Sequence, residues 1–250
     1  WKQIVKEEEH EEFGELLEAL QVLDEHLKDH RRDILYHRER RRNPKRKRLH
    51  CTFDYSAEIP YGMQLGKIST SAVDMKPGLC SNFCNVLEWY DEEKNKLEKR
   101  VVNVFSDSKD HDGYSVTKHM DFIFKNDPVA KKLISEVNTV EWHYDNASGN
   151  VNHELTYKFL KEDPQKYPNP NEFTMAPHVA NHGHAIADST FPTTYRMIRA
   201  SGPHKNVKSM VIGLNDEQKK ANEVRLRKGK PQCTQHVAYK HNLRKKKSAK

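Results

Sequence analysis

The chain has 250 residues, of which 35% are hydrophobic and 32% charged. This length suits one domain with extensions or two small domains, and the charge content predicts a compact core with solvated, charged arms. Four cysteines exclude a disulfide-rich scaffold and indicate a reducing compartment. No apolar segment is long enough to span a membrane, and no secretory signal is visible. The first residue is Trp1 rather than Met, which leaves open a longer protein with further N-terminal sequence.

The net charge is +7, and the positive charge is clustered. Residues 38–48 contain eight Lys or Arg side chains and one acid, and residues 240–250 add six basic side chains with no acid. Such clusters neutralise phosphates or act as nuclear import signals. Two separate basic runs on one chain therefore favour a polyanion partner, and as import signals they would indicate the nucleus.

Residues 1–42 are predicted to form one long amphipathic helix. Apolar side chains recur at spacings of three and four from Phe13 to Leu35. Acidic residues dominate the start of the helix and basic residues its end, in agreement with the helix dipole, and Asn43-Pro44 stops it. The apolar stripe has to be buried, either on the domain that follows or on a second copy of the helix, so a homo-oligomer is one of two expectations.

The rest of the chain predicts a mixed α/β domain with short connections between its early strands, as in an antiparallel meander. The predicted strands are 49–55, then two or three among 65–75, 83–90 and 100–105, and finally 137–145 and 172–175. The predicted helices are 114–125, 151–161 and 183–200, and Pro192 is expected to kink the last helix or to delay its start. Beyond Ser201 the apolar pattern thins into a basic helix and tail.

This order of strands and helices resembles the ribonuclease H-like fold, in which an antiparallel meander lies beside further parallel strands. The expected fold is therefore a mixed five-stranded sheet flanked by helices, with a long N-terminal helix and a basic C-terminal tail. The expected fold divides the chain into three segments. Residues 1–48 form an amphipathic helix and basic linker, residues 49–200 a catalytic-type domain, and residues 201–250 a basic C-terminal extension.

The stretch from Val137 to Asn150 contains the leading candidate for a functional carboxylate. A strand-like run ends at Asp145 and passes at once into Asn-Ala-Ser-Gly, and open sheets place their chemistry beyond the carboxyl ends of strands. The alternative interpretation is plain turn chemistry, because Asp and Asn cap their own backbone. In the predicted order Asp54 ends the neighbouring strand and Asp188 lies on the last helix, so three carboxylates can converge.

Three converging carboxylates suit the cleavage or joining of phosphodiesters. Two divalent ions about 3.5–4 Å apart activate the attacking oxygen and stabilise the leaving oxygen. Mg²⁺ (or Mn²⁺) prefers oxygen ligands and keeps several waters, so one or two carboxylates per ion suffice. Asp107 competes for the role of first acid, because it also ends a strand-like run. Its strand would lie at the sheet edge, away from the Asp145 strand, so Asp54 is preferred.

Four short segments carry a resemblance to a known family. They are Asp54-Tyr-Ser-Ala-Glu-Ile-Pro-Tyr61, Ser106-Asp-Ser-Lys-Asp-His-Asp112, Tyr144-Asp-Asn-Ala-Ser-Gly-Asn150 and His182-Gly-His-Ala-Ile-Ala-Asp188. In the same order they are similar to the motifs Asp-Phe-Ala-Glu-Asn-Tyr, Ser-Asp-x-x-x-His-Asp, Ser-Asp-Gly-x-x-x-Gln-Tyr-Lys-Asn and His-Gly-Lys-x-x-x-Asp. These motifs belong to the ribonuclease H-like, DDE-type transposase or integrase domains of eukaryotic DNA transposons. The resemblance covers roughly residues 20–199.

The resemblance implies a metal-dependent DNA nuclease or transposase. Asp54, Asp145 and Asp188 would be the catalytic acids and would hold two Mg²⁺ or Mn²⁺ ions, and His182 would position the scissile phosphate. The chain departs from the family at Asn146, where the family has glycine, and in the last motif, where His replaces Lys. Two alternatives therefore stand beside catalysis: a domesticated or decayed transposase that binds DNA without cutting it, and a basic nuclear adaptor that dimerises through its N-terminal helix.

A zinc site is the weakest of the expectations. Cys80 and Cys84 are not spaced as a compact zinc knuckle, and no second cysteine pair follows at finger spacing. The histidines that would complete such a site with Cys80 and Cys84 are His178, His182 and His184.

Overall fold

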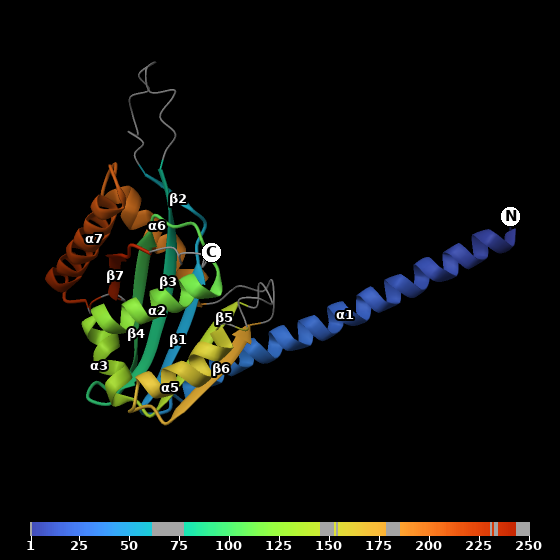
Figure 1. Ribbon diagram of the computed structural model, residues 1–250, viewed down its shortest axis with the longest axis horizontal. Helices are drawn as coiled ribbons and strands as arrows, with labels where there is room; N and C mark the ends of the chain where they lie inside the picture. Colours follow the sequence, from blue (N-terminus) through green and yellow to red (C-terminus); the bar gives the residue numbers. More distant parts are fainter. Residues whose placement is uncertain are drawn as a thin grey trace, which may run out of the picture.

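The computed structural model describes residues 2–61, 78–145, 153, 155–178, 186–230, 232 and 235–243. A mixed sheet of seven strands forms its centre, helices cover both faces of the sheet, and one long helix projects away from it (Figure 1). The strands are β1 (Arg48–Tyr55), β2 (Ile59–Tyr61), β3 (Gly78–Asp91), β4 (Lys96–Ser106), β5 (Thr139–Asp145), β6 (Glu172–His178) and β7 (Gln235–Lys240). The helices are α1 (Lys2–Arg42), α2 (Gly113–Asn126), α3 (Pro128–Glu136), the π-helical turn η1 (Lys158–Glu162), α5 (Asp163–Lys166), α6 (Ile186–Ala200) and α7 (Val207–Arg227).

The sheet confirms the predicted mixed α/β class. Its strand order is β6-β5-β1-β3-β4-β7, and β2 pairs with β3. β1, β3 and β4 form the antiparallel meander, whereas β5 runs parallel to β1 and β6 parallel to β5. The expectation of five strands was wrong, because β2 and β7 extend the sheet. The strand predicted at 65–75 lies outside the described residues.

The C-terminal part of the chain contributes to the domain more than the sequence predicted. Residues 201–250 were expected as a basic extension, but β7 pairs in parallel with β4, and Met210 and Leu214 of α7 are fully buried.

Pro192 lies inside α6 rather than at its start. Beyond the predicted helix at 114–125, α3 is a separate helix that Asp127 caps by accepting a hydrogen bond from the Ala130 backbone N–H (2.9 Å).

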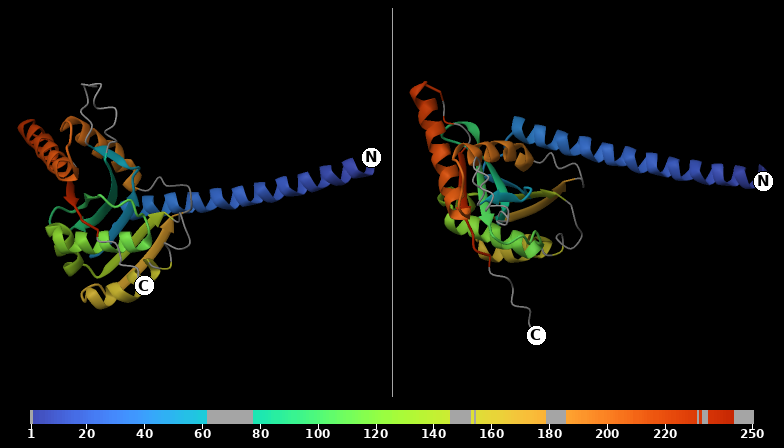
Figure 2. Two further views of the ribbon diagram at one scale, coloured as in Figure 1. Left: turned by 45° about the horizontal axis from the view of Figure 1, so that its top comes forward. Right: turned by 90° about the horizontal axis from the view of Figure 1, so that it is seen from above.

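Strand alternation divides the buried side chains between two layers. On one face, Leu49, Cys51 and Phe53 of β1 join Trp142 of β5 in the main core, under α2, α3 and η1. On the other face, side chains of β3 and β4 pack beneath α6, for example Val86 against Phe191. The views in Figure 2 show these two helical layers on opposite sides of the sheet.

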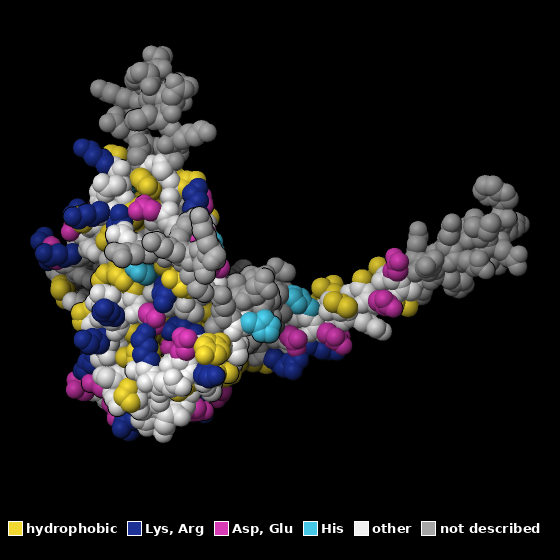
Figure 3. Space-filling model, in the orientation of Figure 1, with side chains coloured by type: hydrophobic (Ala, Val, Ile, Leu, Met, Phe, Trp, Pro, Cys, Tyr) yellow, Lys and Arg dark blue, Asp and Glu magenta, His cyan; other side chains and the backbone are white. Residues whose placement is uncertain are grey.

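The long helix α1 meets the sheet only near its C-terminal end. There Arg40 is buried and forms an ion pair with Glu88 of β3. The apolar stripe predicted for this helix is present but exposed, because the domain does not cover it, and hydrophobic side chains follow the projecting helix in Figure 3. Among the described residues, none of the helices has the length and apolar character needed to cross a membrane.

Candidate functional site

The first two predicted acids lie at the ends of neighbouring strands. The last residues paired between the parallel strands β1 and β5 are Phe53 and Tyr144, so Asp54 and Asp145 are the next positions on each strand. Adjacent strands are about 4.8 Å apart. Asp54 is half-buried, and its Oδ1 accepts a hydrogen bond from the Tyr55 backbone N–H (2.7 Å). Asp145 is the last residue of β5, and its side chain lies outside the described part of the chain.

The third acid lies on α6, a helix that packs against β1 and β3. Asp188 belongs to the first turn of α6, and its side chain is also outside the described part. Two residues later, Thr190 Oγ1 lies 3.3 Å from Cys84 Sγ, and Cys84 is the register partner of Asp54 on β3. The described backbone therefore brings the three positions towards one end of the sheet. His182 lies outside the described residues.

The competing acid Asp107 is far from this group. It is exposed beyond the end of β4, where Tyr61 donates a hydrogen bond to it (3.2 Å) and Lys240 Nζ pairs with it (3.1 Å). β1 and β3 lie between β4 and β5. The expectation that β4 would be an edge strand was wrong, because β7 lies outside it, but the separation of Asp107 from Asp145 is confirmed.

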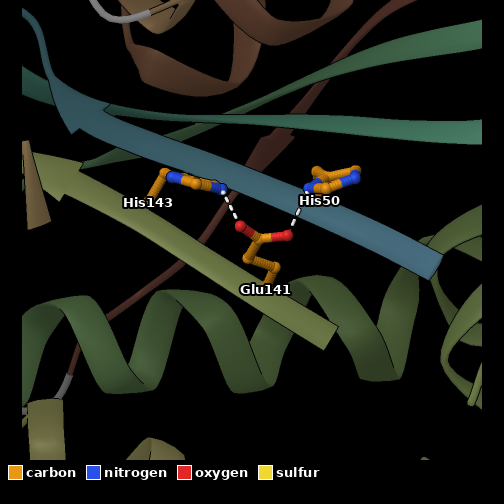
Figure 4. Close-up of side chains that lie close together, drawn as sticks. All are labelled: His50, Glu141 and His143. Carbon is orange, nitrogen blue, oxygen red and sulfur yellow. Dashed lines mark ion pairs between the residues drawn. The ribbon is translucent and has the colours of Figure 1, made fainter. Parts of the chain in front are cut away.

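A second group of side chains, which the sequence analysis missed, lies on β1 and β5 below the acids. His50 Nδ1 is 2.9 Å from Glu141 Oε2, and His143 Nε2 is 3.2 Å from Glu141 Oε1 (Figure 4). The potential ligand atoms of the three residues all lie within 4.8 Å of one another. Each side chain is at most 5% exposed. The three residues thus form a buried His/Glu/His cluster.

Charged and aromatic neighbours surround the His/Glu/His cluster. Arg48 Nη1 lies 3.4 Å from Glu141 Oε2, and the rings of Tyr36 and His37 on α1 approach the His143 ring with centroid distances of 5.9 and 5.2 Å. A cavity of about 250 Å³ adjoins the cluster between α1 and β1, with Tyr36, Arg40, Arg48 and His50 among its lining residues.

Burial controls the ionisation of the His/Glu/His cluster. Loss of solvent and the nearby charge of Arg40 lower the pKa of His50 to about 2, so its imidazole is neutral at physiological pH. Burial and the neighbouring Glu172 raise the pKa of Glu141 to about 7.

Comparison of the chain with protein-family models, curated proteins and solved structures gave no match. Functional inference therefore rests on the two groups of residues described above, which share β1 and β5. One consists of oxygen donors at the carboxyl ends of the strands. The other combines two imidazoles with one carboxylate within the layer between the sheet and α1.

The His/Glu/His cluster had one local signal in the sequence. Glu141 and His143 are two residues apart on a strand, so they share a face of the sheet. His50 had no such signal, because only the register between β1 and β5 makes it the direct partner of Glu141. The zinc candidates Cys80 and Cys84 are buried free cysteines of β3 and are not members of the cluster.

Proposed function

We propose that this protein is a ribonuclease H-like domain of the transposase or integrase type. It acts on DNA phosphodiesters by two-metal-ion hydrolysis or strand transfer. The observation that supports the proposal best is the parallel pairing of β1 with β5, which makes Asp54 and Asp145 adjacent positions at the carboxyl ends of these strands. In open sheets, ligands bind beyond the carboxyl ends of the strands.

The strand order supports the same fold assignment. The meander β1-β3-β4 and the added parallel strands β5 and β6 give the order β6-β5-β1-β3-β4, which is similar to that of ribonuclease H-like domains. Helix α6 follows β6 in the chain and covers β1 and β3. Its first turn contains Asp188, as the family motif would require.

The proposed site uses Asp54, Asp145 and Asp188 to hold two Mg²⁺ or Mn²⁺ ions. Carboxylate oxygens suit these ions, and Asp54 fits as a half-buried acid that its neighbour's backbone N–H already orients. When bound, the ions would activate the attacking oxygen and stabilise the leaving oxygen. His182 would hold the scissile phosphate in place.

DNA is the proposed partner, and its first contact is the basic turn at residues 42–48. This turn runs into the first residue of β1, whereas Asp54 is the second-last residue of that strand, so Arg48 and Asp54 are roughly 20 Å apart at about 3.3 Å per residue. A duplex advances 3.4 Å per base pair and would cover this distance in about six base pairs. A hollow of about 560 Å³ adjoins the turn and has Arg42, Arg46 and Lys96 among its lining residues. The same basic residues support the proposed nuclear location.

A second copy of the chain is the proposed partner of α1. Leu16, Leu20, Leu23, Leu27 and Ile34 follow the alternating three- and four-residue spacing of coiled-coil core positions, with His30 between the last two. The four leucines are 42–55% exposed although they are the apolar face of the helix. A parallel or antiparallel pair of α1 helices would bury that face.

The experiment that tests the activity is nicking of supercoiled plasmid DNA with Mg²⁺ or Mn²⁺. Wild type should nick the plasmid, and the variants D54N, D145N and D188N should each lose the activity while keeping DNA affinity. D107N is the matched control, because it removes an acid at the end of β4 and should remain active. Equal activity in D145N and wild type would reject the proposed site.

The departures at Asn146 and His184 favour one alternative, a decayed transposase that binds DNA without cutting it. The same assay separates the two functions. Salt-sensitive binding without nicking under either ion would support the alternative.

A further inference from the structure

We propose that His50, Glu141 and His143 form a second metal site, which takes zinc or a similar first-row transition ion. This site is separate from the proposed magnesium site and does not depend on nuclease activity. It joins the neighbouring parallel strands β1 and β5 (Figure 4), on the face where Tyr36 and His37 of α1 approach His143.

The distances within the His/Glu/His cluster match a shared ion. Zinc lies about 2.0–2.2 Å from nitrogen and oxygen ligands, which places tetrahedral ligands roughly 3.3 Å from one another. The observed separations of His50 Nδ1 and His143 Nε2 from the Glu141 oxygens are 2.9 and 3.2 Å. Although His50 Nδ1 is that close to Glu141, it makes no aligned hydrogen bond with any described group.

The donor types select the class of ion. Two imidazoles and one carboxylate suit zinc, cobalt, nickel or copper, whereas magnesium and calcium prefer oxygen ligands throughout. Metal binding requires neutral imidazoles, so affinity at this site should fall as the pH is lowered. The set of two histidines and one glutamate is also a known zinc ligand set.

The surrounding charges leave room for a cation. Arg40 is neutralised by Glu88, and Arg48 lies 3.4 Å from Glu141 and 4.0 Å from Glu172. The carboxylates of Glu88, Glu141 and Glu172 thus lie beside the two guanidinium groups. Arg48 can also orient the Glu141 carboxylate, as hydrogen-bonded neighbours of metal ligands commonly do.

The adjoining cavity of about 250 Å³ gives the ion a path from solvent and leaves space for a water as a further ligand. Residues 50 and 54 of β1 are four apart, as are 141 and 145 of β5. The ion would thus lie about 13 Å below the proposed catalytic edge. At that place it would fix the register of the two strands.

The direct test is a titration of metal-free, full-length protein with Zn²⁺ in competition with a chromophoric chelator, followed by Co²⁺ substitution. We expect one Zn²⁺ per chain, and a visible Co²⁺ spectrum of tetrahedral or five-coordinate type. H50N, E141Q and H143N should each weaken binding by about 10–100-fold or more. H236N is the matched control, because His236 is a buried histidine on β7 outside the His/Glu/His cluster, and it should bind zinc as wild type does.

A measurement on wild type alone covers the case in which a variant fails to fold. X-ray absorption of the zinc-loaded protein should show nitrogen and oxygen ligands with scattering from two imidazoles and no sulfur. Lack of stoichiometric zinc, sulfur in the ligand shell, or unchanged affinity in a folded E141Q variant would each overturn the proposal. Loss of plasmid nicking in D145N with intact zinc binding would separate this site from the catalytic one.

Discussion

Arg40, near the C-terminal end of α1, forms a buried ion pair with Glu88 of β3, and both side chains are at most 5% exposed. This pair links the projecting helix to the sheet. Removal of one partner from such a pair leaves an uncompensated buried charge. We expect R40M to lower the free energy of unfolding by about 3–5 kcal/mol in urea titrations.

The matched control is R31A, which removes an exposed arginine from the same helix and should change stability by less than about 0.5 kcal/mol. Replacement of both partners in R40M/E88L should recover much of the loss, because no buried charge then remains. Equal stabilities of R40M and wild type would contradict a structural role for the pair.

Tyr239 tests whether the C-terminal segment belongs to the folded domain. Its hydroxyl donates a hydrogen bond to Asp127 Oδ2 (2.9 Å), and Arg100 Nη2 contacts the same oxygen at 2.6 Å. Burial and the Asp127 charge raise the pKa of Tyr239 to about 12, so the hydroxyl remains a donor at neutral pH. We expect Y239F to cost about 1.5–3 kcal/mol of unfolding free energy, as for other hydrogen bonds to charged groups.

Tyr157 supplies the control for this change, because it is 53% exposed and lies away from β7. Y157F should leave stability unchanged within error. A C-terminal segment that does not pack on the domain would give the same null result for Y239F.

The contrast between β5 and β7 shows how far the sequence could predict the fold. β5 combines β-forming residues with an abrupt turn signal at Asp145, so its position and its parallel neighbour β1 followed from local pattern and strand order. β7 is six residues long and lies in a basic tail. Its place in the sheet depends on pairing with β4 and on the burial of Ala238, and neither leaves a local signal.

The residues of the candidate sites also differ in how far the sequence could predict them. Asp54 and Asp145 were predictable because each ends a strand-like run before turn residues. The His50–Glu141 contact was not predictable, because the two residues are distant in the chain and meet only through the β1–β5 register. A one-residue shift of that register would turn one of the strands over and separate them.

The burial of His119 predicts a loss of stability in mild acid. It is fully buried on α2 between Phe83 and Tyr55, with His241 Nδ1 3.1 Å from its own Nδ1. Burial, with smaller effects of His241 and His111, lowers its pKa to about 3. Between pH 6.5 and pH 3 the unfolded chain binds a proton that the folded chain does not. Stability therefore falls as pH drops below 6.5, by up to about 1.4 kcal/mol per pH unit.

Urea titrations at pH 7, 6 and 5 measure this slope. H119Q should reduce the slope by the contribution of about one proton, because glutamine does not titrate. H153Q changes an exposed histidine and should keep the wild-type slope. The same slope in H119Q and wild type would show that other groups control acid unfolding.

The basic turn before β1 predicts the salt dependence of DNA binding. Arg42, Lys45 and Arg46 are exposed. Arg48 is left unchanged, because it pairs with the buried Glu141. Each phosphate contact contributes about 0.9 to the slope of log affinity against log salt concentration. The triple alanine variant should therefore weaken binding and reduce the slope by about 2–3 in fluorescence anisotropy titrations.

A variant of equal charge controls for general electrostatics. The triple alanine change at Lys118, Lys131 and Lys132 removes three exposed lysines from α2 and α3. If its slope falls as far as that of the basic-turn variant, the binding follows net charge and has no preferred surface.

The exposed stripe of α1 predicts self-association. Leu20 and Leu27 occupy coiled-coil core positions and are 51% and 42% exposed, so a polar change there should not disturb the domain. We expect L20N/L27N to convert a dimer into a monomer in sedimentation equilibrium, with unchanged unfolding of the domain. V22N is the matched control, because Val22 lies on the same helix, 67% exposed, but outside the core positions. A wild-type monomer at micromolar concentration would reject the second copy as the partner of α1.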